Sequence, residues 1–281
     1  MPELPEVETM RRGIIGVVGA MIVGVERTRC QLKPISITPR ADAFRRRSVG
    51  SRISSVDRVG KRVVLRLDNG NSIVFEPRMT GLVLIAEPPN REHLRFRLRL
   101  SGVKPRQLLY WDRRGLGSVR LLSARQMQEY FGPEKLGPDA LAVAADELRS
   151  RLCGSRRAIK VALLDQRVVA GIGNLYASEM LHAAGIYPNK RCDRLTRGDW
   201  QRLHTSMNDV LEEAIRYEGS TLSDGTYRNA LNDPGGYQDC HRVYDREGQL
   251  CPSCGEGNVK RIVQSQRSTF YCPICQKTQG R

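Results

Sequence analysis

The sequence begins with the run Met1-Pro2-Glu3-Leu4-Pro5-Glu6, whose residue types and spacing could support covalent chemistry. Removal of Met1 would leave Pro2 with a free secondary amine, which can attack an electrophilic carbon and form an iminium. An α-amino group titrates near ~8 and lysine near ~10.4, so the α-amine is the more reactive at neutral pH. Glu3 follows directly and could act as acid or base, and Glu6 lies one helical turn further on. A lone Pro-Glu pair, however, is more often only a helix start.

Four cysteines near the end of the chain form a second candidate site. Cys251 and Cys254 make one Cys-x-x-Cys pair, Cys272 and Cys275 make another, and 17 residues separate the pairs. This spacing is typical of a zinc ribbon, in which four thiolates close a tetrahedral site and leave no position open. We therefore predict one structural zinc ion. A redox pair or two disulfides are weaker alternatives, because the other four cysteines are scattered and suit a reduced compartment.

A glycine-rich turn before a predicted helix is a third candidate site. Residues 169–173 contain two glycines and precede Asn174, which we expect to cap that helix. Backbone N–H groups at such a helix start can bind phosphate. The motif is weak by itself and could be only a turn, but in a basic chain it favours a DNA-backbone contact. Lys260, Arg261 and Arg267 lie between the cysteine pairs, and Arg267 is expected near a hairpin tip.

Composition and charge indicate a globular protein with a polyanionic partner. The chain has 281 residues, 40% of them hydrophobic, which is enough for two domains. Its formal net charge is +16, and residues 1–131 carry 25 Lys and Arg against 12 Asp and Glu. Such an excess favours nucleic acid over a membrane as partner. Without an apolar stretch of ~20 residues or a visible signal peptide, we expect a cytoplasmic protein, nucleoid-associated through DNA binding, with no membrane partner.

Helices and strands must position these groups. Val7, Met10 and Ile14 follow Pro5 at helical spacing, so a first helix can dock and hold Pro2 in place. From about residue 20 to 122 the pattern is that of strands: 63–67 and 72–75 flank an Asn-Gly hairpin signal, and 95–100 alternates strictly. We interpret this half as an antiparallel β-sandwich.

The sequence pattern of the second half of the chain predicts helices. Helical signals begin near residue 123, residues 132–138 are expected to link the halves, and residues 158–166 are expected to form a helix. Thr196 with Asp199 resembles a capping box. Residues 219–245 are loop-like, and a connection of that length is often functional or mobile. The predicted fold class is α+β, with a catalytic β-sandwich domain (1–131), a helical domain (132–245) and a C-terminal zinc finger (246–281).

Three motifs together resemble the formamidopyrimidine-DNA glycosylase family. They are residues 1–9, residues 171–179 (Gly-Ile-Gly-Asn-Leu-Tyr-Ala-Ser-Glu) and residues 266–272 (Gln-Arg-Ser-Thr-Phe-Tyr-Cys). The resemblance covers essentially the whole chain in order. It implies an enzyme that excises oxidised purines, notably 8-oxoguanine and formamidopyrimidines, from duplex DNA and nicks the strand by β,δ-elimination, an AP lyase activity. It also implies that residues 132–245 form a helix–two-turn–helix domain whose 219–245 loop closes over the extruded base. With no oligomerisation signal, we expect a monomer.

The resemblance also implies roles for single residues. Pro2 would attack the sugar C1′ of a flipped-out nucleotide, with Glu3 as the acid/base and Glu6 in support. Phosphate contacts are implied for Lys61, Lys160, Asn174 and Arg267. The contact of Lys61 lies beside the lesion, and Lys61 also counts among the catalytic residues.

Two segments depart from the family pattern. Where the family reads His-x-Gly-Met-Ser-Gly, this chain has Glu76-Pro77-Arg78-Met79-Thr80-Gly81. Where it reads Asp-Pro-Arg-Arg-Phe-Gly, this chain has Asp112-Arg113-Arg114-Gly115-Leu116-Gly117. Met79 and Arg114 would fill the gap left by the flipped base, and Leu116 replaces a wedging phenylalanine. Leucine stacks less well, so lesion range and opposite-base preference are the properties that this change affects.

Two other function classes stay open at this point. A DNA-binding protein that has lost catalysis would explain the basic charge, but a pure binder has no need of a free proline amine. A zinc-ribbon protein that binds RNA or the ribosome would explain the tail and the charge but not the first six residues.

Overall fold

The computed structural model describes residues 2–28, 30 and 32–277, which form two compact units. The residues up to Lys135 make up the first unit together with Ile215–Gln238. Leu136–Ala214 and the residues from Asp239 onward make up the second. The chain therefore returns to its first unit after most of the helical region is complete. The predicted division into three domains stays a prediction.

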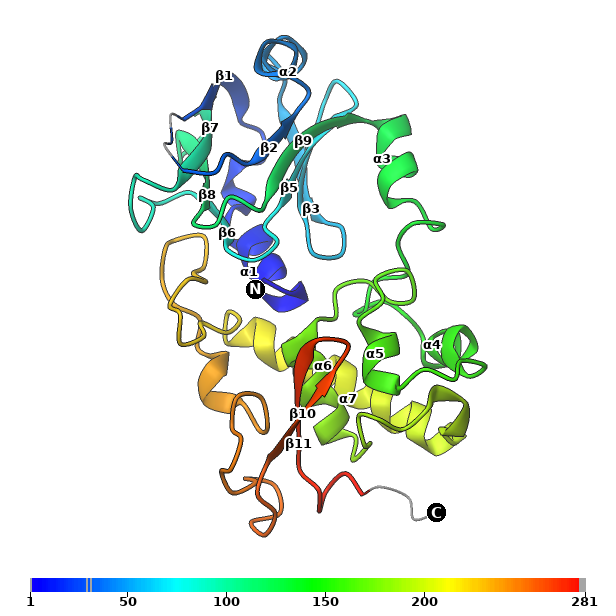
Figure 1. Cartoon of the computed structure of the whole chain (residues 1–281). Helices are drawn as coiled ribbons and strands as arrows, with labels where there is room; N and C mark the ends of the chain where they lie inside the picture. Colours follow the sequence, from blue (N-terminus) through cyan, green and yellow to red (C-terminus); the bar gives the residue numbers. More distant parts are fainter. Residues whose placement is uncertain (1, 29, 31, 278–281) are drawn as a thin grey trace. The chain divides into compact units, whose positions relative to one another are not determined.

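Two sheets form the first unit (Figure 1). Four antiparallel strands form one sheet, in the order β1 (Met21–Arg27), β7 (Leu94–Ser101), β8 (Gln107–Asp112) and β6 (Gly81–Leu84). Five strands form the other, in the order β2 (Ser36–Thr38), β9 (Ser118–Ser123), β5 (Asn71–Glu76), β4 (Val63–Leu67) and β3 (Ile53–Arg58). Side chains from both sheets share one hydrophobic core. The predicted β-sandwich is confirmed, with one difference: β2 and β9 pair in parallel.

The hairpin between β4 and β5 forms where the Asn-Gly signal predicts it. Gly70 has a φ of +78°, a left-handed conformation that glycine adopts without a steric penalty. Asn69 accepts a hydrogen bond from the backbone N–H of Asn71 at 3.0 Å, which closes the turn locally. Val63 and Phe75 then pair across the two strands, both completely buried.

Helix α1 (Leu4–Gly13) packs into the core of the first unit and against β3, β4 and β6. Val7, Met10 and Ile14 are completely buried, as their helical spacing predicts. Its first half is also buried on its polar side, where Glu6 is only 2% exposed. Arg11 and Arg12 lie in the last turn, where positive charge is favourable to the helix dipole.

Two short helices complete the first unit. The β-pattern did not predict α2 (Ala41–Ser48), because it is short, carries three consecutive arginines and buries only Phe44 and Ser48. Phe44 meets the ring of Phe96 edge-on at 5.3 Å, which fixes α2 on the sheet. Helix α3 (Ala124–Phe131) begins at the predicted position, where Ser123 and Gln126 form a reciprocal capping box.

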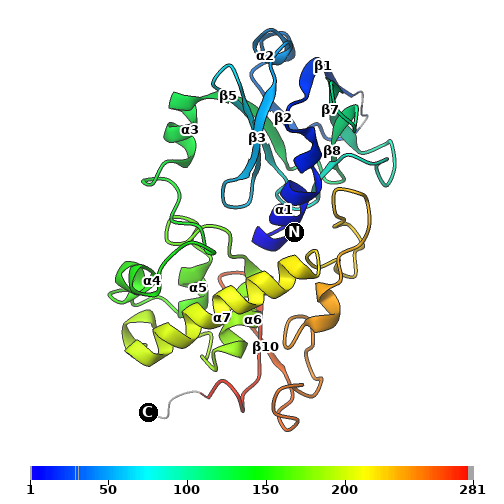
Figure 2. The same cartoon turned by 180° about the vertical axis from the view of Figure 1, so that it is seen from behind.

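Helices are the main regular elements of the second unit (Figure 2). Thr196 and Asp199 exchange the two hydrogen bonds of the predicted capping box, at 2.8 and 3.1 Å. Its helices are α4 (Ala145–Leu152), α5 (Ile159–Leu163), α6 (Asn174–Ala183) and α7 (Arg197–Arg216), the last of which ends in the first unit. Helix α5 is shorter than residues 158–166, and the N-cap of α6 is Gly173, not Asn174 as expected. The side chain of Asn174 makes tertiary hydrogen bonds instead.

A two-stranded hairpin ends the described chain. Strands β10 (Lys260–Gln264) and β11 (Arg267–Tyr271) pair through a two-residue turn in which Ser265 and Gln266 both have positive φ, +46° and +61°. Two residues at positive φ are what a type I′ hairpin requires. The exposed Arg267 therefore lies beside the tip, as predicted. Within the described residues, no helix combines the length and hydropathy that crossing a membrane would need.

Candidate active site and metal centre

The start of α1 fixes Pro2 and Glu3 in a buried setting. Glu3 is the N-cap of the helix: its side chain accepts from the Glu6 backbone N–H. In return the Glu3 N–H donates to Oε2 of Glu6 at 2.8 Å. Pro2 is buried, and Glu3 and Glu6 are 3% and 2% exposed. This reciprocal capping box satisfies two backbone donors at the helix start and fixes the carboxylate of Glu3, the residue that follows Pro2 in the chain.

A segment more than 200 residues away in sequence completes this helix start. The second oxygen of Glu6 accepts from the Ser220 N–H at 2.9 Å. Gly219 has a φ of +79°, and a Cβ there would lie 2.8 Å from Oε1 of Glu6, so only glycine fits. Tyr227 donates to the Glu218 carbonyl at 3.0 Å, and burial raises the pKa of its hydroxyl, which keeps the proton in place. The loop after α7 is thus anchored to α1.

Lys61 lies at the tip of the hairpin that joins β3 and β4. The Val59 N–H donates to the Arg62 carbonyl at 3.0 Å, which leaves Gly60 and Lys61 as the two turn residues. Gly60 has a φ of +55°, as the first central position of a type II′ turn requires. The turn chemistry therefore places a half-buried lysine at the end of a rigid hairpin.

Asp112 joins the two segments that depart from the family pattern. Its buried carboxylate accepts from the Thr80 hydroxyl at 2.5 Å and from the Gly117 N–H at 2.7 Å. The Arg114 N–H in turn donates to Thr80 Oγ1 at 2.9 Å. These bonds make the two loops one structural unit. It carries an exposed Met79 (37%), an exposed Arg114 and a half-buried Leu116.

In the second unit, Lys160 and Asn174 bond to each other and to β11. The Lys160 ammonium donates to Oδ1 of Asn174 at 2.9 Å, to the Ser268 carbonyl at 3.2 Å and to the Thr269 hydroxyl at 2.7 Å. Asn174 donates to the same Ser268 carbonyl at 2.9 Å. Lys160 is only 1% exposed, whereas Asn174 is half-buried. A buried lysine with three protein acceptors orients its neighbours, so Lys160 lies behind Asn174 and not on the surface.

The four predicted metal ligands come together in this unit. Their Sγ atoms all lie within 4.8 Å of one another, with Cys251 and Cys275 3.9 Å apart and Cys254 and Cys272 3.7 Å apart. Tetrahedral coordination with Zn–S bonds of about 2.3 Å needs sulfurs about 3.8 Å apart. Backbone N–H groups of Gly257 and Cys275 point at two of the sulfurs, each at 3.5 Å. The cluster thus fits a four-coordinate metal ion.

Helix α6 supports the four-cysteine cluster. Glu179 is completely buried, and its carboxylate accepts from the backbone N–H groups of Arg242, Val243 and Tyr244 at 2.8 to 2.9 Å. One turn on, Nε2 of His182 lies 3.4 Å from Sγ of Cys251. The helix therefore fixes both the chain entering the cysteine region and one of the cysteines.

Several of these supporting residues carry no usable sequence signal. Glu6 and Ser220 are 214 positions apart, so no spacing rule connects them. Asp112 and Thr80 lie in the two segments that depart from the family pattern, and that departure is the only sequence feature that points to them. Glu179 closes the second family motif, and its position there was the only sign of its role.

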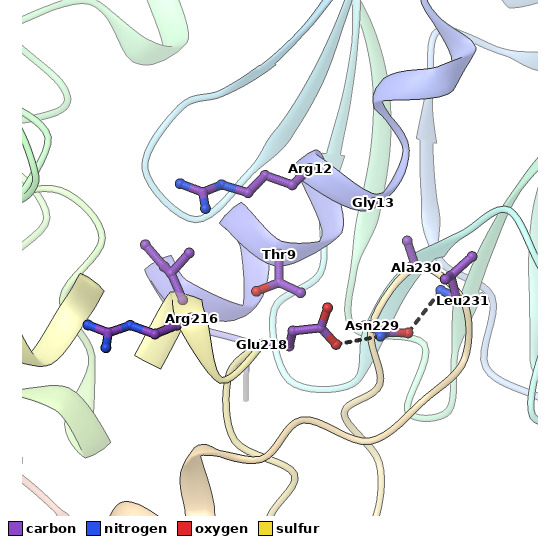
Figure 3. Close-up of a pocket in the computed structure, with 9 residues that line it drawn as sticks. Thr9, Arg12, Gly13, Arg216, Glu218, Asn229, Ala230 and Leu231 are labelled. Carbon is purple, nitrogen blue, oxygen red and sulfur yellow. Dashed lines mark hydrogen bonds between the residues drawn. The ribbon is translucent and has the colours of Figure 1, made fainter. Parts of the chain in front are cut away.

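A pocket of about 410 Å³ lies along the later turns of α1 (Figure 3). Its lining includes Thr9, Arg12 and the loop at 229–231, but not Pro2 or Glu3. Asn229 donates to Glu218 at 2.8 Å, which braces the loop. Gly13 permits the close approach, because a Cβ there would lie 2.5 Å from that of Ala230. This pocket is therefore separate from the start of α1.

Two family models match most of this chain, and known proteins are similar to it over nearly its whole length. Residues 1–119 match the family model described as the formamidopyrimidine-DNA glycosylase N-terminal domain, and residues 135–226 match the formamidopyrimidine-DNA glycosylase H2TH domain. The formamidopyrimidine-DNA glycosylase of Chloroflexus aggregans is 40% identical, over 98% of each chain. That of Streptococcus mutans is 36% identical, over 99% of this chain and all of the other.

Solved structures are also similar to this chain over nearly its whole length. The MutM (Fpg) protein from Thermus thermophilus has a TM-score of 0.85 and 37% identity, over 99% of this chain and 100% of the other. The Lactococcus lactis Fpg in complex with DNA containing an abasic site has a TM-score of 0.85 and 30% identity, over 98% and 100%. A mutant of the Lactococcus lactis protein, in complex with Fapy-dG-containing DNA, also has a TM-score of 0.85 and 30% identity, over 99% of this chain and 100% of the other.

Proposed function

The chain belongs to the formamidopyrimidine-DNA glycosylase family, and we propose that it excises oxidised purines through a Schiff base at Pro2 and then nicks the strand by β,δ-elimination. Its partner is duplex DNA that contains damaged bases. The observation that carries the proposal is the start of α1, where the consecutive residues Pro2 and Glu3 are both buried and Glu3 is fixed by Glu6. A binding protein would have no use for a carboxylate held so rigidly beside a proline.

The covalent step begins with removal of Met1, which lies outside the described residues. The lone pair of the Pro2 nitrogen attacks the sugar C1′, the bond from C1′ to the base breaks, and the base leaves with a proton. The amine then gives up its proton, the bond from C1′ to the ring oxygen breaks and that oxygen takes up a proton, so that C1′ and the Pro2 nitrogen share an iminium double bond. That electron sink acidifies the neighbouring sugar proton, and its loss expels the 3′ phosphate. A second elimination expels the 5′ phosphate.

Glu3 is the group placed to move these protons. Its backbone is fixed by the bond to Glu6, and its carboxylate is held at the helix start beside Pro2. Glu6 spans from this cap to Ser220 and so keeps the loop after α7 in register with the nucleophile. Precise placement of acid and nucleophile accounts for much of the rate of such a reaction.

DNA binding is divided between positioning and insertion. Lys61, Asn174 and Arg267 contact phosphates, which places the strand without reading its sequence. Met79 and Leu116 enter the stack where the base has left, and Arg114 hydrogen-bonds the orphaned partner base. Lys160 acts through Asn174, because its ammonium is buried against β11.

Zinc is the metal that the four-cysteine cluster suits best. Four thiolates at tetrahedral separations favour zinc among the common divalent ions, and the closed ligand set gives it a structural role. The ion would hold the strands that carry Arg267. No step of the chemistry at Pro2 involves it.

Borohydride trapping on abasic-site DNA tests the mechanism. The wild type should form a stable cross-link that mass spectrometry maps to Pro2, and its N-terminal peptide should lack Met1. A form that retains an extra residue before Pro2 should lose both trapping and nicking. Lys135→Arg, which removes an exposed lysine amine from the same unit, is the control and should trap normally. Full trapping by the extended form would show that another amine attacks the sugar.

A further inference from the structure

Glu76 gathers three arginines at the end of β5. Its carboxylate pairs with Arg62 at 2.9 Å and lies 3.8 Å from both Arg78 and Arg120. The carboxylate is 13% exposed, so it is shielded from water on most sides. Three cations around one carboxylate leave a local excess of two positive charges. A cluster with such an excess attracts an anion.

Aromatic rings hold two of these arginines in place. The guanidinium of Arg62 lies 4.8 Å from the centre of the Phe131 ring, and that of Arg120 lies 5.3 Å from the Tyr130 ring. Their side chains are only 20% and 25% exposed. Both are therefore fixed between Glu76 and helix α3, and they provide a rigid positive background.

Arg78 is the exposed member of the cluster. Its side chain is 57% exposed, and its contact with Glu76 is longer than a hydrogen bond. A phosphate could therefore bind its N–H groups without breaking a hydrogen bond to Glu76. The next residue in the chain is Met79, which the proposed function places in the DNA stack.

The backbone of Arg78 indicates that its side chain has a use. Its φ is +51°, in the left-handed region that a residue with a Cβ rarely adopts. The family pattern given above has glycine at this position, which would fit without strain. A strained arginine that stands where glycine would fit is an observation that points to function.

We propose that Arg78, supported by Glu76, Arg62 and Arg120, binds a DNA phosphate next to the step that Met79 enters. The inference rests on the proposed function only for the placement of Met79 against DNA. A phosphodiester brings one negative charge, so the cluster keeps a net positive charge when it is bound. The contact acts on affinity and register and leaves the chemistry at Pro2 unchanged.

Two substitutions separate binding from backbone strain. Arg78→Gly removes the guanidinium and the strain, whereas Arg78→Ala removes the guanidinium and keeps the Cβ. Both should weaken binding to undamaged and abasic-analogue duplexes several-fold and lower the slope of log K against log salt by about one. Only Arg78→Gly should raise the melting temperature. Arg46→Ala removes one exposed charge from α2, at the other end of the first unit from the start of α1 (Figure 1), and is the control.

The outcomes distinguish this inference from the proposed function. Unchanged affinity and salt slope in both Arg78 variants, with borohydride trapping intact, would overturn the inference alone. A loss confined to certain base sequences would also overturn it, because a phosphate contact affects all sequences alike. Absence of trapping in the wild type would overturn the proposed function, while binding to the same duplexes would still decide the role of Arg78.

Discussion

Glu8 shows how single residues secure α1, the helix that follows the proposed nucleophile Pro2. It accepts hydrogen bonds from Arg11 at 2.8 Å, Arg12 at 2.9 Å and Arg58 of β3 at 3.1 Å, with a side chain only 9% exposed. Burial alone would raise the pKa of the Glu8 carboxyl, but hydrogen bonds from Arg11 and Arg12 lower it below its ordinary value of 4.5. The ionised form is therefore part of the fold.

Replacing Glu8 by glutamine should remove a pH-dependent part of the stability. A carboxyl with a lowered folded pKa stabilises the protein above pH 4.5 and loses that contribution as the pH falls through the folded pKa. At pH 7 we expect Glu8→Gln to lower the free energy of unfolding by about 1–2 kcal/mol, since solvent screens part of the attraction to the arginines. Denaturant unfolding at pH 7 and at pH 3 should show that the difference in free energy of unfolding between wild type and Glu8→Gln is smaller at pH 3. An equal difference in free energy of unfolding at both pH values would contradict this account.

Arg114 should decide the preference for the opposite base. Its backbone is held by Thr80 and Asp112, so only its side chain is free to adjust. A forked donor suits the acceptors of cytosine better than the edge of adenine, and such a contact is worth about 1–3 kcal/mol. Single-turnover excision of 8-oxoguanine should be faster opposite cytosine, and Arg114→Ala should reduce the difference. Leu116→Phe should enlarge it. Equal wild-type rates opposite both bases, unchanged in Arg114→Ala, would show that this loop does not read the partner strand.

At the scale of elements, α5, α6 and β11 meet at Lys160. Replacing Lys160 by methionine should misplace Asn174 and weaken DNA binding, because buried acceptors lose their donor. The salt slope should stay unchanged, since Lys160 itself releases no counterion. Arg267→Ala is the matched comparison and should lower the slope by about one unit. DNA titrations at several salt concentrations measure the affinity and the salt slope of both variants. If Lys160→Met lowered the salt slope as much as Arg267→Ala does, Lys160 would be in contact with phosphate.

Local patterns in the sequence predicted elements well where the cause is local. The Asn69-Gly70 turn, the Thr196–Asp199 box and the paired cysteines all act within a few residues, and the structure confirms each. Helix α2 and the parallel pairing of β2 with β9 depend on tertiary packing, so no local pattern indicated them. Glu6 with Ser220 shows the same limit at the candidate site, because the partner comes from a distant return of the chain.

At the scale of the whole molecule, the two units carry different parts of the proposed function. The first contains the start of α1, Lys61 and the loops with Met79 and Arg114. The second contains Asn174, Arg267 and the metal centre. The proposed chemistry and insertion thus belong to one unit, whereas two of the four proposed phosphate contacts, Asn174 and Arg267, belong to the other. Removal of the metal should therefore affect binding and leave the chemistry intact.

Metal removal should release the hairpin without unfolding the first unit. The core beside the cysteines contains few buried side chains, chiefly Val243, Val259 and Phe270, and a cluster that small needs a metal to stay ordered. A chelator should therefore lower the thermal transition of the second unit, weaken DNA binding and reduce the salt slope by about one as Arg267 loses its position. Borohydride trapping at saturating DNA should persist.

The control for this experiment is Arg267→Ala with the metal in place. It should reproduce the change in salt slope while leaving the thermal transition where it is, because Arg267 is exposed and the cysteine cluster is intact. Metal analysis before and after chelation should show the loss of one zinc per chain. If chelated protein kept its affinity and salt slope, or if trapping at saturating DNA vanished with the metal, the ion would have a role other than holding the strands that carry Arg267.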